Sequence, residues 1–380
     1  MSFVEPFADE LLSSWLARVR CDQRAPGEPL LRAYRNRAGH WRHPDVNPKK
    51  SMIAELAASE GFTENSVAEL GLCYRYPRIT PDFVAWHHVP SDDPSRDFAP
   101  ALTLRLSWCS RCLAEDYAAG RPAYIRADWA MAAWGFCFRH HWPLVDRCVS
   151  CGSSHWAIKR SSQGPPRLCC IRCRRGLERA HPRALELEPA AQPIWINIVA
   201  FEAALRGALR GKVPDQFRFN DTSAGQLLEE SARICLLFAR AHRRWRLRDR
   251  LLHRFAAPVL TLDNVCPNEP SCEMPLALAS PSMRRCLIAI CAAMLDADCD
   301  PTVRNEDEPV VDVWARMVDS IALQQFIQDR QACSPTLKRT VEAACHRNEK
   351  VERMSALRSA STAYKTLFRD AAGNAFSSRH

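Results

Sequence analysis

Four closely spaced pairs of potential metal ligands stand between residues 109 and 173. The pairs are Cys109 and Cys112, Cys137 and His140, Cys148 and Cys151, and Cys170 and Cys173. Two residues between ligands allow a tight knuckle turn that aims both side chains at one ion, and a second pair completes a tetrahedron. Four protein ligands leave no position for a catalytic water, so we predict structural zinc sites.

Pairing neighbours along the chain is favoured, because shorter loops lose less entropy on closure. Two Zn²⁺ ions would then be held by Cys109, Cys112, Cys137 and His140, and by Cys148, Cys151, Cys170 and Cys173. A crosswise arrangement, in which the first and third pairs share an ion, is the alternative. Cys169 and His141 compete with their neighbours Cys170 and His140, which the two-residue spacing favours.

The zinc segment is rich in arginine and poor in large aliphatic residues. Such a segment would bury little apolar surface, and the binding free energy of a metal can then become folding free energy. We therefore expect chelation to unfold residues 109–173 while the C-terminal helices stay largely intact.

Composition places the chain among globular proteins that remain in the cytoplasm. It has 380 residues, 47% of them hydrophobic, and 52 basic against 43 acidic side chains. This modest positive excess suits a polyanionic partner such as double-stranded DNA. Residues 1–10 lack the basic and apolar regions of a secretory signal, and no apolar stretch approaches the roughly 18 residues of a membrane span.

Hydrophobic periodicity predicts a mainly α protein with small zinc-ribbon β elements. We expect an N-terminal helix-turn-helix-like domain, two tandem zinc-binding knuckle domains, a helical domain with a basic helix, and a C-terminal helical domain. Their expected bounds are residues 1–100, 101–185, 186–265 and 282–376.

The helix-turn-helix prediction depends on a spacing of small and aliphatic residues. Ala57, Gly61 and Val67 fit the positions at which two helices approach closely around a turn. The second helix also carries Glu64 and Glu69, which would be repelled by phosphates. A packing or partner-docking unit is therefore favoured over a base-reading one.

Two arginine-rich clusters are candidates for contact with nucleic acid. The first surrounds the last two ligand pairs, and the second follows one predicted helix. The candidates are Lys159, Arg160, Arg167, Arg172, Arg174 and Arg175 in the first cluster, and Arg243, Arg244 and Arg246 in the second. Arginines on a rigid metal knuckle would form a preformed phosphate-binding surface. The alternative for each cluster is an ordinary solvated face.

The first half of the chain resembles the TniQ family of transposition proteins. The opening run is Pro6, Phe7, Ala8, Asp9, Glu10, Leu11, Leu12, Ser13, Ser14, Trp15, Leu16, Ala17 and Arg18. The zinc region follows the family order through Trp108, Cys109, Cys112, Leu113, Ala114, Glu115, Asp116, Tyr124, Ile125, Arg126, Trp129, Cys137, His140, Leu144, Cys148, Cys151 and Gly152. The chain departs from the family where Ser110 replaces a usual Pro and His141 a usual Gly.

The resemblance implies a non-enzymatic adaptor in DNA transposition. TniQ-like proteins join the transposase to an AAA+ ATPase (TniB-like) and help to choose target DNA. Their N-terminal segment tends to meet the ATPase, so Trp15 and Arg18 are the candidate partner-binding residues. A homodimer is a further candidate assembly.

Enzyme classes with familiar local motifs are not indicated. The sequence has no glycine-rich phosphate loop, no H-E-x-x-H and no G-x-S-x-G. The main alternative to the adaptor is a zinc-ribbon, helix-turn-helix transcription regulator that binds DNA without transposition partners.

Overall fold

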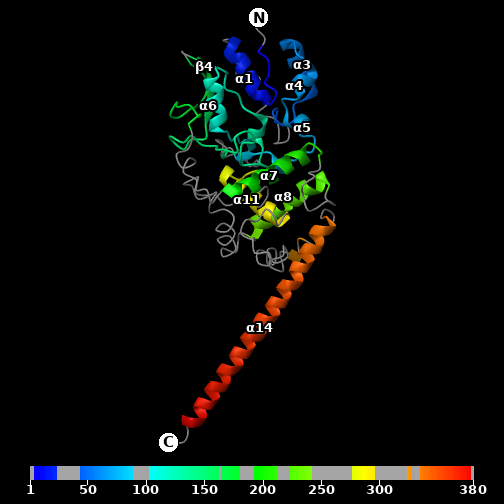
Figure 1. The fold of residues 1–380 in the computed structure, drawn as a ribbon, viewed down its shortest axis with the longest axis vertical. Helices are drawn as coiled ribbons and strands as arrows, with labels where there is room; N and C mark the ends of the chain where they lie inside the picture. Colours follow the sequence, from blue (N-terminus) through cyan, green and yellow to red (C-terminus); the bar gives the residue numbers. More distant parts are fainter. Residues whose placement is uncertain are drawn as a thin grey trace, which may run out of the picture.

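The computed structural model is mostly helical and carries two small antiparallel sheets (Figure 1). It describes residues 4–23, 43–88, 102–161, 164–179, 192–212, 223–241, 276–295, 323, 324, 326, 328 and 334–377. The helices of the first half are α1 (Leu12–Gln23), α3 (Lys50–Glu60), α4 (Glu64–Ala68), α5 (Leu72–Arg75) and α6 (Ser110–Ala118), with 3-10 turns η2 (Pro81–Phe83) and η3 (Ala127–Ala130). Those of the second half are α7 (Gln192–Leu209), α8 (Ala224–Ala241), α11 (Pro281–Leu295) and α14 (Pro335–Ser377).

An N-terminal unit forms where α1 packs against α3 and α4. The predicted apolar stripe of α1 is buried in a cluster with the inner faces of the other two helices. Its members are Leu12, Trp15, Leu16, Val19, Met52, Ile53, Leu56, Ala57, Val67, Ala68 and Leu70. The Trp15 indole packs edge-on against Phe62, and its Nε1 donates to the carbonyl of Val4 at 2.8 Å.

The turn between α3 and α4 agrees with the sequence spacing. Gly61 ends α3 with φ 73°, a left-handed conformation that glycine adopts without steric cost. The Thr63 side chain then accepts from the amide of Ser66 and begins α4. However, α4 is only five residues long, so a helix-turn-helix of the DNA-reading kind is not confirmed.

Buried polar groups fix the start of α1. Arg18 binds both carboxylate oxygens of Glu10, and the two side chains are 6% and 0% exposed. Ser14 donates to the same carboxylate at 2.7 Å. Asp45 accepts from the amide and the hydroxyl of Ser13, each at 2.7 Å, and so caps the first turn.

The larger hydrophobic core joins the region of the predicted metal ligands to the C-terminal helices. Four tryptophans, Trp86, Trp108, Trp129 and Trp134, are each at most 2% exposed in it. Most of residues 123–144 are buried. The expectation that the whole zinc segment would lack a hydrophobic core is therefore wrong for its first half.

Helices α7, α8 and α11 pack together beneath this region (Figure 1). Each side chain that the structure describes in α11 is buried, which is the pattern of a central helix with no solvent face. The expected helix at residues 283–295 is thus present, whereas the basic arginines 243–246 and most of residues 310–329 lie outside the described residues. The four predicted domain boundaries remain a prediction.

The sheets are two hairpin-like pairs. Strand β1 (Trp86–His88) pairs with β2 (Leu102–Leu104), and β3 (Trp156–Ser161) pairs with β4 (Gly164–Cys170). The β3–β4 register places Trp156 opposite Cys170 and Lys159 opposite Arg167. The Pro166 carbonyl accepts from the amide of Ala123, which ties β4 to the segment that follows α6.

Helix α14 projects away from the rest of the molecule and ends far from α1 and α3 (Figure 1). Among the side chains described in α14, those in the core are Leu337, Val341, Ala344 and Cys345, all in its first turns. Its attachment includes a hydrogen bond from the Ser334 amide to Glu230 of α8. Within the described residues, no helix combines the length and apolarity needed to cross a membrane.

Replacing Arg18 by Ala is expected to destabilise the protein by about 3–5 kcal/mol, because the Glu10 carboxylate would stay buried without its cation. The midpoint of urea unfolding, followed by tryptophan fluorescence, measures this loss. The double variant Arg18→Met, Glu10→Gln serves as the control and should lose less, since both charges leave together. Unchanged stability of Arg18→Ala would show that the buried pair contributes little.

Candidate metal centres

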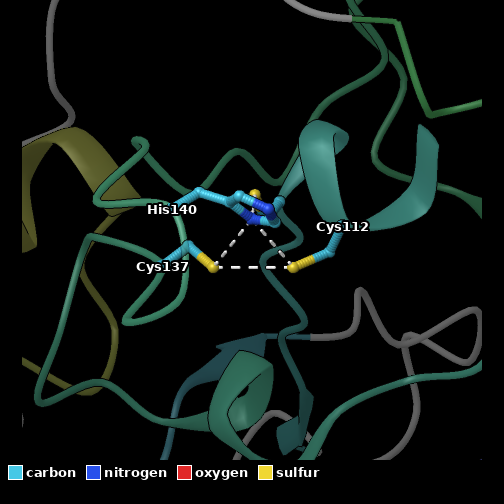
Figure 2. Close-up of side chains that lie close together, drawn as sticks. Cys112, Cys137 and His140 are labelled. Atoms are coloured by element: carbon cyan, nitrogen blue, oxygen red, sulfur yellow. Dashed lines mark hydrogen bonds between the residues drawn. The ribbon is translucent and has the colours of Figure 1, made fainter. Parts of the chain in front are cut away.

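The first centre brings three thiols and one imidazole together at the start of α6. The ligand atoms of Cys109, Cys112, Cys137 and His140 all lie within 4.8 Å of one another. Figure 2 shows the side chains of Cys112, Cys137 and His140 pointing toward one another, from α6 and from a loop. The Sγ atoms of Cys112 and Cys137 are 3.6 Å apart, and His140 presents Nδ1 to them at 3.3 and 3.7 Å.

The second centre contains four thiols around the β3–β4 hairpin. The Sγ atoms of Cys148, Cys151, Cys170 and Cys173 lie within 4.8 Å of one another. Two of the cross-pair distances are 3.6 Å, between Cys148 and Cys173, and 3.5 Å, between Cys151 and Cys170. A tetrahedral zinc with bonds of about 2.3 Å requires sulfur separations of roughly 3.8 Å, which both centres approach.

The sequential pairing predicted from loop length is therefore confirmed. The eight residues form two clusters, and each cluster could hold a metal ion. Neighbouring residues of a strand alternate between faces, so Cys169 faces away from the second cluster. Its side chain is 8% exposed. His141 is exposed and outside the first cluster. Among the described residues, these are the two groups of three or more side chains suited to a metal.

The same type of backbone hydrogen bond occurs in each of the four ligand pairs. The amide of the residue after the second ligand donates to the carbonyl of the first ligand. The donors are Leu113 to Cys109 at 3.2 Å, His141 to Cys137 at 2.7 Å, Gly152 to Cys148 at 2.8 Å and Arg174 to Cys170 at 2.9 Å. This repeated turn explains the two-residue spacing, because it curls the backbone around the two side chains.

Left-handed backbone follows three of the four pairs. His141 has φ 49°, Gly152 φ 70° and Arg174 φ 62°. A glycine after the ligand histidine, as is usual in the TniQ family, would adopt this conformation without steric cost, so His141 carries strain that glycine would avoid. Ser110 occupies the first position of α6, where proline is equally well accommodated. Neither departure removes a ligand.

The clustered thiols differ strongly in acidity. The Cys112 thiol lowers the pKa of Cys109, but neighbouring Cys137 and burial outweigh it and raise that pKa to about 12. Hydrogen bonds from Cys109 and Cys112 lower the pKa of Cys137. At Cys170 burial acts in the raising direction, yet backbone amides of Cys173 and Arg172 and nearby thiols bring the pKa to about 6. Metal binding replaces the remaining thiol protons.

Glu115 orients the histidine ligand of the first centre. Its Oε1 lies 2.7 Å from Nε2 of His140, the ring nitrogen that faces away from the sulfurs. Arg139 binds Oε2 of the same carboxylate at 2.7 Å. A carboxylate on the second nitrogen fixes the ring orientation and tautomer of a metal-bound histidine. Sequence reasoning placed Glu115 in a family motif but assigned it no role.

Two buried polar side chains from the C-terminal helices hold the backbone beside Cys137. Glu202 of α7, fully buried, accepts from the amides of Gly135 at 2.6 Å and Phe136 at 3.3 Å. Burial raises the pKa of Glu202 well above its usual value. Arg285 of α11 donates to the carbonyl of Leu144 at 3.0 Å. Glu202 is the one acidic residue of α7, and this isolation is the sequence feature by which its role could have been found.

Glycine is required at position 135 because α11 passes so close. A Cβ added there would lie 2.2 Å from Cγ of Arg285. The segment that carries Cys137 therefore contacts the other ligands of the first centre on one side and helices α7 and α11 on the other.

Several predicted nucleic-acid residues surround the second centre. Arg172, Arg174 and Arg175 are exposed on the last ligand turn, and Lys159 is half-buried on β3. Arg167 pairs with Glu178 and lies over the Tyr117 ring at 4.1 Å, so its charge is already partnered. The side chain of Arg160, and all of Arg243, Arg244 and Arg246, lie outside the described residues.

The predicted partner-binding residues Trp15 and Arg18 are both inside the N-terminal unit. Trp15 is 0% exposed and Arg18 is 6% exposed. Their side chains shape α1 and its surroundings, and a partner would meet them indirectly. Their assignment to a partner surface remains a prediction.

Comparison with known families gives one match. The TniQ family model matches residues 1–144. The resemblance inferred from the opening run and from the first zinc ligands is therefore confirmed for this part of the chain, which contains the complete first centre. No curated protein and no solved structure gives a significant match.

Metal analysis of the native protein is expected to find two equivalents of bound zinc. Glu115→Gln should weaken one of them by about 10–100-fold, because the carboxylate that orients His140 loses its charge. Competition with a chromophoric chelator resolves the two affinities.

The control for this prediction is Glu64→Gln, which removes an exposed carboxylate at the start of α4. Both affinities should stay unchanged in that variant. Equal metal affinities in Glu115→Gln and the native protein would contradict the orienting role.

Proposed function

We propose that this chain is a non-enzymatic, zinc-containing adaptor in DNA transposition, which links recognition of target DNA to an AAA+ ATPase and the transposase. The observation that carries the proposal is the position of the first metal centre. All four of its ligands lie within the segment that matches the TniQ family.

The donor sets favour zinc in structural roles. Tetrahedral sites of four sulfurs, or of three sulfurs and a histidine nitrogen, suit zinc, whose closed form has no open position for substrate or water. In each cluster the four ligand atoms already lie within 4.8 Å of one another. Zinc bound there would supply rigidity, while the chain's own surfaces would contact partners.

The second centre supports a role in contacting DNA. Its ligand turns carry exposed Arg147, Arg172, Arg174, Arg175 and Arg179, set around the half-buried Cys151 and Cys173. Little of the backbone around them is free to move once the metal is bound, so few rotational states are lost on binding phosphate. We assign the phosphate-binding surface of the adaptor to these arginines.

The geometry gives less support to a stand-alone transcription regulator. Helix α4 spans five residues, and Glu64 and Glu69 are exposed at its two ends. Such a helix offers little length for the major groove, and its carboxylates would oppose phosphates. We favour partner docking for the α3–α4 unit.

The adaptor function is tested by a pull-down with a TniB-like AAA+ ATPase and a transposase from the same organism. We expect the zinc-loaded chain to retain both on DNA. Cys112→Ser should abolish capture of the ATPase, because the first centre organises the matched segment. Cys173→Ser should mainly reduce retention on DNA, because the second centre carries the exposed arginines.

Two results would contradict the adaptor. The first is full capture of the ATPase by protein stripped of both metals. The second is sequence-specific retardation of a promoter fragment by the chain alone, without capture of either partner, which would favour the regulator.

Binding to duplex DNA should weaken steeply with salt. Replacing Arg172 and Arg175 by Ser is expected to lower the slope of log affinity against log salt by about 2, since each phosphate contact contributes about 1. Fluorescence anisotropy over a salt series measures the slope. The control variant Lys49→Ser, Lys50→Ser removes two exposed charges next to α3. Equal reductions in both variants would count against a site at the second centre.

A further inference from the structure

Helix α14 exposes several large apolar side chains. Six large hydrophobic residues are exposed among the residues that the structure describes, and three of them lie in one stretch of α14. Val351, Met354 and Leu357 are 61%, 47% and 64% exposed. An exposed apolar series on a projecting helix is typical of a surface that another helix covers.

The helix has two apolar series in different phases. The first, Leu337, Val341 and Ala344, is buried in the core. The second begins at Met354 and Leu357 and continues in the sequence at the alternating three- and four-residue spacing of a coiled coil. Its further members by sequence are Ser361, Tyr364, Phe368, Ala371 and Ala375. At 3.6 residues per turn Met354 and Leu357 face away from the first series.

Charges are segregated beside the second series. The heptad positions that flank it carry Arg353, Arg358 and Lys365 and no acidic residue. Glu352 falls on the opposite side of the helical wheel, and Glu349 precedes Met354 by more than one turn. Flanking positions determine which helix can pair, because their side chains meet across the seam.

A second copy of this chain does not fit that pattern. Parallel pairing would bring Arg353 of one copy beside Arg358 of the other, and antiparallel pairing would bring like residues together. Both arrangements place positive charges in contact. The complementary partner is therefore a helix with the same apolar spacing and acidic flanking residues.

We propose that the Met354–Leu357 face of α14 is a docking surface for an acidic amphipathic helix of a partner protein, bound as a two-stranded coiled coil. The apolar seam would supply the buried surface, and the arginines would select acidic flanks. The inference does not depend on the transposition role, because it rests on α14 alone.

The test uses the full-length chain and two designed helical peptides of four heptads each. Both have Leu at the seam positions, and their flanking positions are all Glu in one and all Lys in the other. We expect the Glu peptide to bind at least about tenfold more tightly than the Lys peptide, measured by fluorescence anisotropy. Leu357→Lys should abolish binding, because it places a charge in the seam.

Two further variants separate the surface from general effects of charge. Ser359→Lys is the matched control, since it adds the same charge on the opposite face and should bind like the native chain. Arg353→Glu combined with Arg358→Glu should reverse the preference, so that the Lys peptide binds more tightly. Circular dichroism verifies that each variant keeps its helix content.

Three outcomes would overturn the proposal. One is equal affinity for the two peptides, and another is unchanged binding by Leu357→Lys. The third is a stable dimer of the native chain, seen by sedimentation, that Leu357→Lys dissociates, because the same face would then bind a second copy.

Discussion

The fold depends most on how the backbone around Cys137 is held from two sides. On one side Cys137 and His140 converge with the start of α6. On the other, the buried Glu202 and Arg285 bind the backbone of the same segment from α7 and α11. A polar group buried without hydrogen-bond partners is costly, so the two amides that donate to Glu202 hold it in place. The metal ligands and the C-terminal helices are therefore parts of one mechanical unit.

The two centres differ in what surrounds them, and this difference separates their roles. The first lies against a core with four deeply buried tryptophans, so a metal bound there would add to an existing hydrophobic framework. The second centre is built around a hairpin. Apart from the cysteines, Leu168 and Leu177 are among the few buried side chains there. A metal bound there would supply the stabilisation that a hydrophobic core supplies elsewhere, as in other small metal-bound modules. Exposed arginines can gather there because little apolar packing competes for the surface.

The ligands, the first helix and the turn at Gly61 could be predicted because each depends on local spacing. Two residues between ligands, apolar residues three and four apart, and a glycine between two helices are all readable along the chain. The two-residue spacing also distinguished the ligands Cys170 and His140 from their neighbours Cys169 and His141. These local signals also brought out the family resemblance.

Long-range partners could not be predicted in this way. Glu202 and Gly135 meet only because α7 packs beneath the region of the first metal centre, and no spacing connects residues so far apart. The ion pair between Arg18 and Glu10 is a second example, because no local spacing indicated that these two side chains are buried together. The hydrophobic surroundings of the first centre were missed because many of its core residues are Trp, Ala and Phe, scattered among polar residues without periodicity.

The length of α14 sets a distance as well as a surface. From Cys345, the last of its residues in the core, to Ser377, a helix rises by roughly 50 Å at about 1.5 Å per residue. That is close to the rise of about 15 base pairs of duplex at roughly 3.4 Å each. A molecule held at the far end of this rod would thus stand more than one full turn of the double helix away from the body, and the rod would act as a spacer between them.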